Sequence, residues 1–571
     1  MIRERPPIFS EWLMEPIRRN MPLYLKVALA AVMINLFALV TSLFTMTVYD
    51  RVIPNNATAS LIGLSIGFAV VVVLDFILKL LRAYFVDIAG ADIDSNIGES
   101  LFRRVLALRL DQKDRPTGAI AGMMRELETL RDFFASATLT AIVDVPFILL
   151  TLLLMAAIGG WVVLVPLVLI ASVFFVAWVI HPAMDRLSAR ALGEGLGKQA
   201  VLVETLGALE MVKASKAGDL LAGRWRAAVD RHSRSALRQR LINTISMTFT
   251  GTAQSISYAG IVIVGVGLVA DHELTTGGLV ACSILSGRAM GPLAQIASLL
   301  SRLTGTRTAY RELDQMMAGQ IEGPAQGGGL RPMAVAGNIE FRNVEFRYPG
   351  SNQAVLRGIN FKIQPGERVA LLGRVGSGKS TVARLLLGLY HPDEGSVLVD
   401  GTDVRHYDPV PLRHHIGAVL QDTSLFTGSV RENVVLGRSV VDDAEMLRVC
   451  HISGTHQFMG ALADGYDLKL ADRGEGLSGG QRQSIAIARA LAGAPQILLF
   501  DEPSSAMDQH SEALLIDRLL NEAAGRTLLI VTHRPALLRL VDRIIVLDSG
   551  CIAADGPRDL VLHKLNQAKA A

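Results

Sequence analysis

The sequence predicts a membrane-embedded, all-α domain of six helical spans, followed by a soluble α/β domain that contains a phosphate-binding P-loop. Three observations predict this order. Half of the 571 residues are hydrophobic and only 19% are charged, yet the apolar excess lies almost entirely before residue 300. Long apolar runs fill that first half, and a glycine-rich loop follows an apolar strand in the second. A chain of this length has room for more than one domain.

Six apolar runs are long enough to cross a bilayer, which needs about 20 mostly apolar residues per helical span. They lie at residues 23–48, 61–85, 138–158, 161–180, 245–270 and 277–300. The first run is far longer than the core of a signal peptide, so we expect it to remain as an anchor after the polar residues 1–22. An even number of spans returns the chain to its starting side.

Basic residues determine which side that is, because Lys and Arg gather on the cytoplasmic side of a membrane. They are abundant between spans two and three and between spans four and five, and four arginines lie before the first span. The opposite connections are short and carry only Arg51. The N-terminus and the soluble domain are therefore expected in the cytoplasm. We also expect the two long basic segments to continue as helices and to turn at 111–118 and 206–218.

Residues 323–337, with Gly327-Gly328-Gly329 and two prolines, have the composition of a flexible linker. The expected division of the chain is a cytoplasmic segment at 1–22, a six-span domain at 23–310, a linker at 311–336 and a soluble domain at 337–571.

Composition excludes some functions. The net charge of +3 is small for this length and indicates no nucleic-acid partner. Cys282, Cys450 and Cys551 lack the spacing of a disulfide framework or a zinc site. We expect all three to be buried small hydrophobes in a reducing compartment.

The soluble domain contains a P-loop pattern directly after a strand at 368–372. Its residues are Gly373, Arg374, Val375, Gly376, Ser377, Gly378, Lys379 and Ser380, with Thr381 next in the following helix. The glycines allow backbone N–H groups to surround phosphate oxygens, and the helix presents its positive end. Lys379 is expected to reach the β- and γ-phosphates and the Ser380 hydroxyl to ligate Mg²⁺. The expected ligands are therefore a nucleoside triphosphate and Mg²⁺.

A second strand, at 497–500, ends in two acidic residues. Asp501 suits the Mg²⁺ shell, and Glu502, one residue further, suits a carboxylate that polarises the attacking water. A solvated turn would also place two acids at a strand end, but the P-loop upstream favours the catalytic interpretation.

The segment Leu477-Ser478-Gly479-Gly480-Gln481, called the signature segment below, precedes a helix rich in Ala and Ile. Glycines and a serine at a helix N-terminus form an anion site. Since the P-loop already serves this chain's own nucleotide, the second site implies a second subunit.

With these residues in order, the soluble domain resembles the ABC transporter family throughout. The resemblance implies a six-helix exporter domain followed by an ABC nucleotide-binding domain, with ATP and Mg²⁺ as cofactors. It implies that Tyr348 stacks on adenine, that Gln421 senses Mg²⁺ and the γ-phosphate, and that His533 contacts the γ-phosphate. The catalytic residues are then Glu502, His533, Lys379 and Gln421. The signature segment closes on the partner's ATP, and Asp508 is the acid of the D-loop, residues 504–508. Met507 replaces the more usual leucine. Two structural interpretations stay open: strand packing for Tyr348, and a capping or core histidine for His533.

The membrane half adds a finer resemblance. Three features resemble type I secretion ATPases, the haemolysin and RTX-adhesin translocators. They are the motif at 48–55 (VYDRVIPN), the residues 472–476 (DRGEG) before the signature segment, and the layout of six spans. This implies a homodimer in the bacterial inner membrane, with a periplasmic membrane-fusion adaptor, an outer-membrane channel and a secreted polypeptide as partners. Many such proteins carry an N-terminal peptidase-like domain. Only about 20 residues precede the first span here, so we expect no such domain and no leader cleavage.

Charged residues inside spans cost about 2.5–3.5 kcal/mol each on insertion scales, so each has a structural or functional reason. Asp75 and Lys79 are four residues apart and are expected to neutralise each other on one helix face. Arg288, four residues before Pro292, has no such partner on its own helix. Lining of the translocation path and packing between helices both stay open for it.

Other functions share part of this pattern. A lipid or drug exporter has the same domain order and the same ATPase motifs, and is the alternative within transport. A soluble ABC ATPase of DNA repair or translation is excluded by the six spans. A membrane receptor that binds ATP without turnover is disfavoured because Glu502 and His533 are both present.

Overall fold

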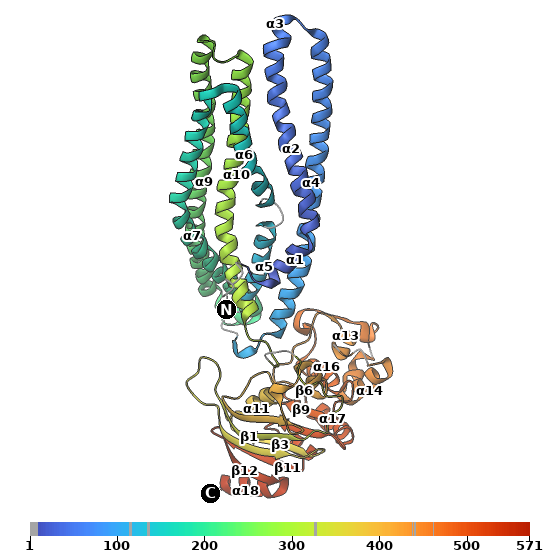
Figure 1. Ribbon diagram of the computed structural model, residues 1–571. Coiled ribbons are helices and arrows are strands. Elements are labelled where there is room, and N and C mark those ends of the chain that lie inside the picture. Colours follow the sequence, from blue (N-terminus) through green and yellow to red (C-terminus); the bar gives the residue numbers. More distant parts are fainter. Residues whose placement is uncertain are drawn as a thin grey trace, which may run out of the picture. The chain divides into compact units, whose positions relative to one another are not determined.

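The computed structural model describes residues 9–112, 117–133, 138–324, 328–436, 438, 441–460 and 462–570. The chain forms two compact units (Figure 1). The first consists of Met1–Leu106 and Arg115–Gly319, and the second of Ala107–Asp114 and Gln320–Ala571.

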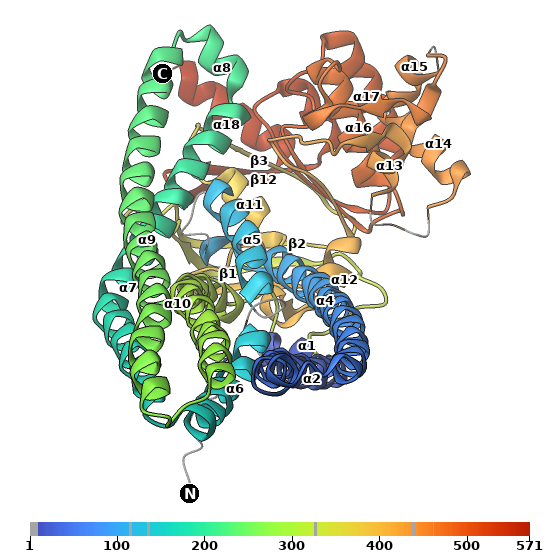
Figure 2. The same ribbon diagram turned by 90° about the horizontal axis from the view of Figure 1, so that it is seen from above.

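The first unit is helical. Its helices are α1 (Glu11–Arg19), α2 (Met21–Thr47), α3 (Ile53–Asn55), α4 (Thr58–Ala107), α5 (Thr117–Asp132), α6 (Thr138–Gly159), α7 (Leu164–Gly207), α8 (Leu209–Ala214), α9 (Gly218–Ala270) and α10 (Thr276–Ala318). Helix α10 packs along α2, α6, α7 and α9, and α7 packs along α9, which Figure 2 shows from above.

These helices form the six-helix membrane domain that the sequence predicts. Four helical stretches among the described residues are long and apolar enough to cross a membrane: Met21–Asn55, Thr58–Ala107, Val145–Gly207 and Gly218–Ala270. The third contains most of α6 and all of α7, so it holds two expected spans, and α10 occupies the position of the sixth. Helices suit this role because they satisfy their backbone hydrogen bonds internally where water is absent.

The long helices continue beyond the apolar runs, as predicted. The second expected turn is confirmed, because α7 ends at Gly207, the short α8 follows, and α9 begins at Gly218. The first expected turn, at 111–118, lies partly outside the described residues; α4 ends at Ala107 and α5 begins at Thr117.

Two expectations about side chains have different outcomes. Lys79 Nζ lies 2.6 Å from Asp75 Oδ2, so the ion pair within α4 is confirmed. Cys282 and Cys450 are buried, as predicted, but the prediction for Cys551 was wrong because it is exposed. Cys551 begins the edge strand β12, where alternate side chains face solvent.

Asp50 links the end of α2 to the start of α10. It lies in a π-helical turn, Val48–Val52, that follows α2. Its Oδ1 accepts a hydrogen bond from Gly277 N at 2.8 Å, and its Oδ2 accepts one from Thr275 Oγ1 at 2.7 Å. A carboxylate is favourable there because the first N–H groups of α10 lack partners within the helix. A Cβ on Gly277 would lie 2.5 Å from Asp50 Oδ1 and 2.6 Å from Met46 O, so only glycine fits.

The second unit is an α/β domain with two main sheets. One is antiparallel with strand order β2 (Leu356–Ile363), β1 (Ile339–Phe346), β4 (Glu394–Val399), β5 (Thr402–Asp403). The other has the order β12 (Cys551–Pro557), β11 (Arg543–Asp548), β3 (Arg368–Gly373), β10 (Thr527–Val531), β9 (Ile497–Asp501), β6 (Ile416–Val419). It is parallel except for β12. A small pair is formed by β7 (Gly428–Ser429) and β8 (Lys469–Leu470).

Helices accompany these sheets. They are α11 (Lys379–Leu386), α12 (Pro409–His414), α13 (Val430–Val435), α14 (Asp443–Ser453), α15 (Thr455–Met459), α16 (Gly479–Leu491), α17 (Gln509–Glu522) and α18 (Arg558–Ala570).

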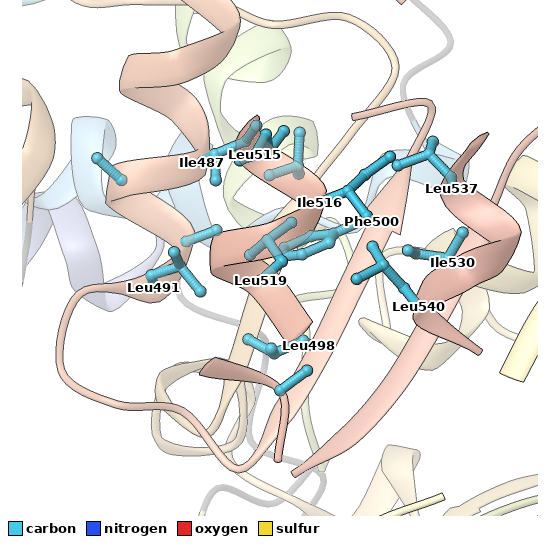
Figure 3. Close-up of a cluster of buried hydrophobic side chains, with 14 of the residues drawn as sticks. Ile487, Leu491, Leu498, Phe500, Leu515, Ile516, Leu519, Ile530, Leu537 and Leu540 are labelled. Atoms are coloured by element: carbon cyan, nitrogen blue, oxygen red, sulfur yellow. The ribbon is translucent and has the colours of Figure 1, made fainter. Parts of the chain in front are cut away.

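The parallel strands contribute to two hydrophobic cores because successive side chains of a strand point to opposite faces. In β9, Leu498 and Phe500 belong to one core, and Ile497 and Leu499 to the other. Figure 3 shows the first core, where Phe500 lies among leucines and isoleucines of α16, α17 and β10. Burial on both faces holds β9 rigidly, and its carboxyl end carries Asp501.

The carboxyl ends of three strands lie level with one another. Val531 of β10 pairs with Leu371 of β3 and with Asp501 of β9. The P-loop begins at the last residue of β3, Glu502 follows Asp501 at the end of β9, and Thr532-His533 follow β10 directly. In open parallel sheets this edge is where ligands bind.

Candidate active site

The P-loop is a tight turn that only glycine permits at two positions. Gly378 has φ +99°, and a Cβ on it would lie 2.5 Å from Leu356 Cδ2. A Cβ on Gly373 would overlap the carbonyl oxygen of Leu547. Since the backbone rather than side chains fills this space, its N–H groups can approach a phosphate closely. The Ser377 hydroxyl is buried within the loop and has no hydrogen-bond partner among the described residues.

Lys379 folds back over this loop. Its Nζ donates hydrogen bonds to the carbonyl oxygens of Gly373 and Arg374, both at 2.9 Å. Burial lowers its pKa, and the nearby carboxylates of Glu502 and Asp501 partly oppose that effect. The ammonium group is therefore held between the phosphate-binding loop and two acidic side chains.

Asp501 has a buried oxygen without a partner. The residue is 2% exposed, and its Oδ1 makes no hydrogen bond within the described part of the chain. Burial raises its pKa, and a hydrogen bond with Ser380 opposes the rise. A buried carboxylate oxygen beside a hydroxyl fits Mg²⁺, which proteins usually hold through one or two carboxylates together with phosphate oxygens.

Glu502 is held in a strained conformation. Its φ is +53°, in the left-handed region that residues other than glycine rarely adopt. Its N–H donates to Val531 O at 2.9 Å. Its Oε1 lies 2.6 Å from His533 Nδ1, and the carboxylate is 11% exposed while the histidine is 73% exposed. The structure thus brings the acid that follows β9 together with the histidine that follows β10.

Gln483 in α16 is a functional candidate that the sequence analysis missed. It is 4% exposed and uses both ends of its amide. Its Nε2 donates to Glu502 O at 2.9 Å, and its Oε1 accepts from Ala506 N at 3.0 Å. It therefore connects the helix after the signature segment to Glu502 and the D-loop. The sequence does contain a sign that Gln483 is buried: it lies four and eight residues before the apolar Ile487 and Leu491, on the same face of a helix.

The signature segment forms the N-terminus of α16 and has its own capping. Ser478 Oγ accepts from Gln481 N at 3.2 Å, and Gln481 Oε1 accepts from Ser478 N at 2.9 Å. A Cβ on Gly480 would lie 3.1 Å from Ala506 O, so the D-loop packs closely here. A cavity of about 200 Å³ lies beside this end, and Ser478, Gly480, Asp508 and Ser511 line part of it.

The D-loop is fixed by hydrogen bonds to its own domain. Asp508 caps α17, since Oδ1 accepts from Ser511 N at 2.9 Å. Arg534, next to His533, donates to Ser505 O at 2.9 Å and to Glu512 Oε1 at 3.1 Å. Glu512 also accepts a short hydrogen bond from Ser504. Among the described residues, no hydrogen bond or ion pair joins the signature segment to the P-loop.

Tyr348 and Gln421 have different surroundings. Tyr348 is half-buried. Its hydroxyl lies 3.0 Å from Thr381 Oγ1 and accepts a hydrogen bond from Arg384 Nη1 at 2.9 Å. Its ring contacts Phe346 and Tyr390 edge-on, so strand packing accounts for part of its role. Gln421 is exposed two residues after β6, which pairs with β9.

Comparison with known proteins agrees with this geometry. Residues 24–293 match the family described as ABC transporter transmembrane region, and residues 356–505 match the family described as ABC transporter. The chain is 31% identical over 559 residues to the leukotoxin translocation ATP-binding protein LktB of Pasteurella haemolytica-like sp. (strain 5943B), covering 97% of this chain and 78% of the relative. Identity and coverage are the same for the toxin RTX-I translocation ATP-binding protein of Actinobacillus pleuropneumoniae.

Among solved structures, the chain resembles a bacterial Atm1-family ABC exporter with ATP bound. The TM-score is 0.83 with 25% sequence identity, and the match covers 96% of each chain.

Proposed function

The chain belongs to the ABC transporter family, and on this basis we propose that it drives a polypeptide across the inner membrane as part of a type I secretion system. It is a multi-pass inner-membrane protein with a cytoplasmic ATPase domain, and it couples ATP hydrolysis to transport. The proposed cargo is an RTX-type toxin, protease or adhesin, because the relatives named above are toxin translocation proteins.

One observation carries the catalytic part of the proposal. The Glu502 carboxylate, 2.6 Å from His533, lies at the same sheet edge as Lys379 and as the Asp501 oxygen that accepts no hydrogen bond from the described residues. A P-loop without an adjacent carboxylate would bind nucleotide but would lack a group to orient water.

In the proposed mechanism, the P-loop N–H groups and Lys379 hold the β- and γ-phosphates, with Tyr348 against the adenine. Glu502 accepts a hydrogen bond from the attacking water and orients it in line with the γ-phosphate. His533 contacts the γ-phosphate, and its hydrogen bond fixes the Glu502 side chain. Gln421, which follows β6, senses the γ-phosphate. Ser380, Gln421 and Asp501 would hold Mg²⁺, which supplies charge stabilisation for the transferred phosphoryl group.

The proposal includes a homodimer with two shared sites. Ser478, Gly479, Gly480 and Gln481 form a helix N-terminus suited to an anion, and Asp508 lies beside it. Each signature segment would therefore close on the nucleotide held by the partner's P-loop. ATP draws the two domains together and hydrolysis releases them, giving alternating access across the membrane domain.

Further partners belong to the same proposal. They are a periplasmic membrane-fusion adaptor and an outer-membrane channel, with no nucleic acid. The division at residues 22/23, 310/311 and 336/337 also stays a proposal; α10 itself continues to Ala318.

The test is export in cells. Deletion of the protein should remove one or a few large polypeptides from the surface or medium. Expression of the wild type should restore them, and Glu502→Gln should not. An unchanged secreted proteome with altered lipid or drug efflux would instead favour the lipid or drug exporter.

A further inference from the structure

A cavity of about 260 Å³ lies within the membrane domain among α2, α6 and α10. Its polar wall residues are Asn35 of α2, Thr151 of α6 and Arg288 of α10. Arg288 is 12 residues beyond Thr276, the first residue of α10, which corresponds to roughly 18 Å along the helix axis. The cavity therefore lies at the depth of the bilayer core, which is about 30 Å thick.

Arg288 is a cation without a counter-charge among the side chains that the structure describes. Among the described residues it forms no ion pair and no hydrogen bond. Arginine stays protonated in proteins, so it cannot avoid the penalty of burial in a membrane by losing its charge. Charged residues inside spans accordingly face a water-filled cavity or a partner, and Arg288 lines the cavity described above.

The other polar side chains of this wall already have partners. Asn35 Nδ2 donates to Ala31 O at 3.0 Å, and Thr151 Oγ1 donates to Phe147 O at 2.7 Å. Both bonds lie within their own helices. The guanidinium of Arg288 is therefore the polar group of the cavity wall that can donate hydrogen bonds to a ligand.

Small residues keep the space beside Arg288 open. A Cβ on Gly291 would meet no atom within 4 Å, and one on Gly287 would meet only Gln254 Nε2 at 4.0 Å. Pro292 has no N–H to donate to the Arg288 carbonyl oxygen, which adds a potential acceptor. The volume is below the usual range of drug-sized pockets, about 300–1,000 Å³, and suits a single side chain.

We infer that this cavity binds an acidic side chain of the exported polypeptide, with Arg288 donating hydrogen bonds to its carboxylate. The inference rests on the proposed function, because a passing polypeptide brings side chains to this depth. A guanidinium matches a carboxylate in a bidentate geometry that an ammonium group cannot reproduce. The cavity is lined by three helices that pack on one another within the bundle, so a cargo side chain is favoured over a lipid headgroup as its occupant.

The experiment measures peptide binding to the full chain in phosphatidylcholine nanodiscs without nucleotide. Two fluorescent synthetic peptides of equal length are used, one with Asp and Glu residues and one with Asn and Gln in their places. The wild type should bind the acidic peptide at least about tenfold more tightly, as expected for a charge-assisted hydrogen bond. Arg288→Gln should remove this preference, and Arg288→Lys should recover only part of it.

Two further variants serve as a control and as a second test. Arg307→Gln removes an exposed arginine of the same helix and should keep the preference. Gly291→Val fills the open space without removing the charge, and should weaken binding of the acidic peptide. Size-exclusion elution and ATP binding show whether each variant is folded.

Each outcome decides between explanations. Equal affinity of the wild type for the two peptides overturns the inference and leaves polypeptide export standing. Failure of the wild type to bind either peptide counts against polypeptide cargo itself. Competition by added phosphatidylglycerol would assign the cavity to lipid and overturn the inference.

The side chain of Asp144, in α6, lies outside the described residues. If Arg288→Gln fails to fold and the double variant with Asp144→Asn folds again, Arg288 is half of a structural ion pair and the inference is wrong. If Arg288→Gln fails to fold and the double variant does not restore it, Gly291→Val decides: unchanged affinity for the acidic peptide overturns the inference.

Discussion

Glu502 Oε1 and His533 Nδ1 lie 2.6 Å apart, although the two residues follow different strands of the parallel sheet. The pair lies at the edge of the sheet where the carboxyl ends of β9 and β10 are level with each other. A carboxylate fixed in this way can orient water without rearranging first, which lowers the barrier of hydrolysis.

The first prediction is that Glu502→Gln binds ATP normally but hydrolyses it at least about a hundredfold more slowly, because the water loses its basic partner. Phosphate release and binding of a fluorescent nucleotide measure the two properties. Asp548→Asn changes another acid at the carboxyl end of a strand, β11, and should leave the rate unchanged. Near-normal phosphate release from Glu502→Gln would remove Glu502 from the mechanism.

The second prediction concerns Gln483. Gln483→Ala removes the amide that bridges Glu502 O and Ala506 N, while Glu502 O keeps the hydrogen bond from Ser505 N, so kcat should fall about tenfold while ATP affinity is kept. Gln496→Ala removes a different amide, which donates to Gly525 O, and serves as control. If Gln483 acts through Glu502, its substitution adds little in the Glu502→Gln background. A full additional loss there would contradict a positioning role.

The third prediction is a shared site. A fragment of residues 320–571 carrying Glu502→Gln should be monomeric alone and dimeric with MgATP in size-exclusion chromatography. Adding Ser478→Arg should block the dimer, because bulk and charge then occupy the N-terminus of α16 where the partner's γ-phosphate would dock. Nucleotide binding by the monomer should persist. An ATP-dependent dimer of the Ser478→Arg fragment would rule out the shared site.

The fourth prediction is a pH dependence of stability. Burial raises the pKa of Asp501 above its ordinary value of 3.8, so the charged form is disfavoured in the folded state. Its stabilising contribution is complete below the unfolded pKa and is lost as the pH rises through the folded pKa. Asp501→Asn should therefore stabilise the nucleotide-free protein increasingly as the pH rises above the ordinary aspartate value of about 4. Thermal unfolding with a chelator measures this, and a pH-independent difference would contradict it.

The fifth prediction concerns the contact of Asp50 with α10. Gly277→Ala should lower the stability of the membrane domain by about 1–3 kcal/mol, because its Cβ meets Asp50 and the Met46 carbonyl. Gly267→Ala, where a Cβ meets nothing within 4 Å, is the matched control. Thermal unfolding in detergent compares the two. Equal unfolding temperatures for the two variants would contradict the prediction, because the end of α2 would then shift at little cost in free energy.

The sequence predicts those parts of the site whose residues lie close together along the chain. The P-loop, Asp501 and Glu502 are each defined by a strand and the residues directly after it, so spacing identifies them. The pair of Asp75 and Lys79 is predictable for the same reason, since four residues are one helical turn.

Contacts between distant segments leave no such pattern. Gln483 reaches Glu502 and Ala506 through tertiary packing of α16, and nothing in its spacing indicates these partners. The motif at 48–55 is visible in the sequence, but the acceptor role of Asp50 depends on Gly277, more than 200 residues later. The exposure of Cys551 depends likewise on β12 being an edge strand, which a local composition does not indicate.

The positive φ of Glu502 has a consequence for the evolution of this protein. Glycine would adopt that conformation without the penalty of about 1–3 kcal/mol that other residues bear. Selection for thermal robustness alone would therefore replace Glu502, and the ATPase would be lost with it. A glutamate persists in this conformation only under continuous selection for turnover, so a stabilised variant with Gly at position 502 would mark a lineage that had ceased to transport.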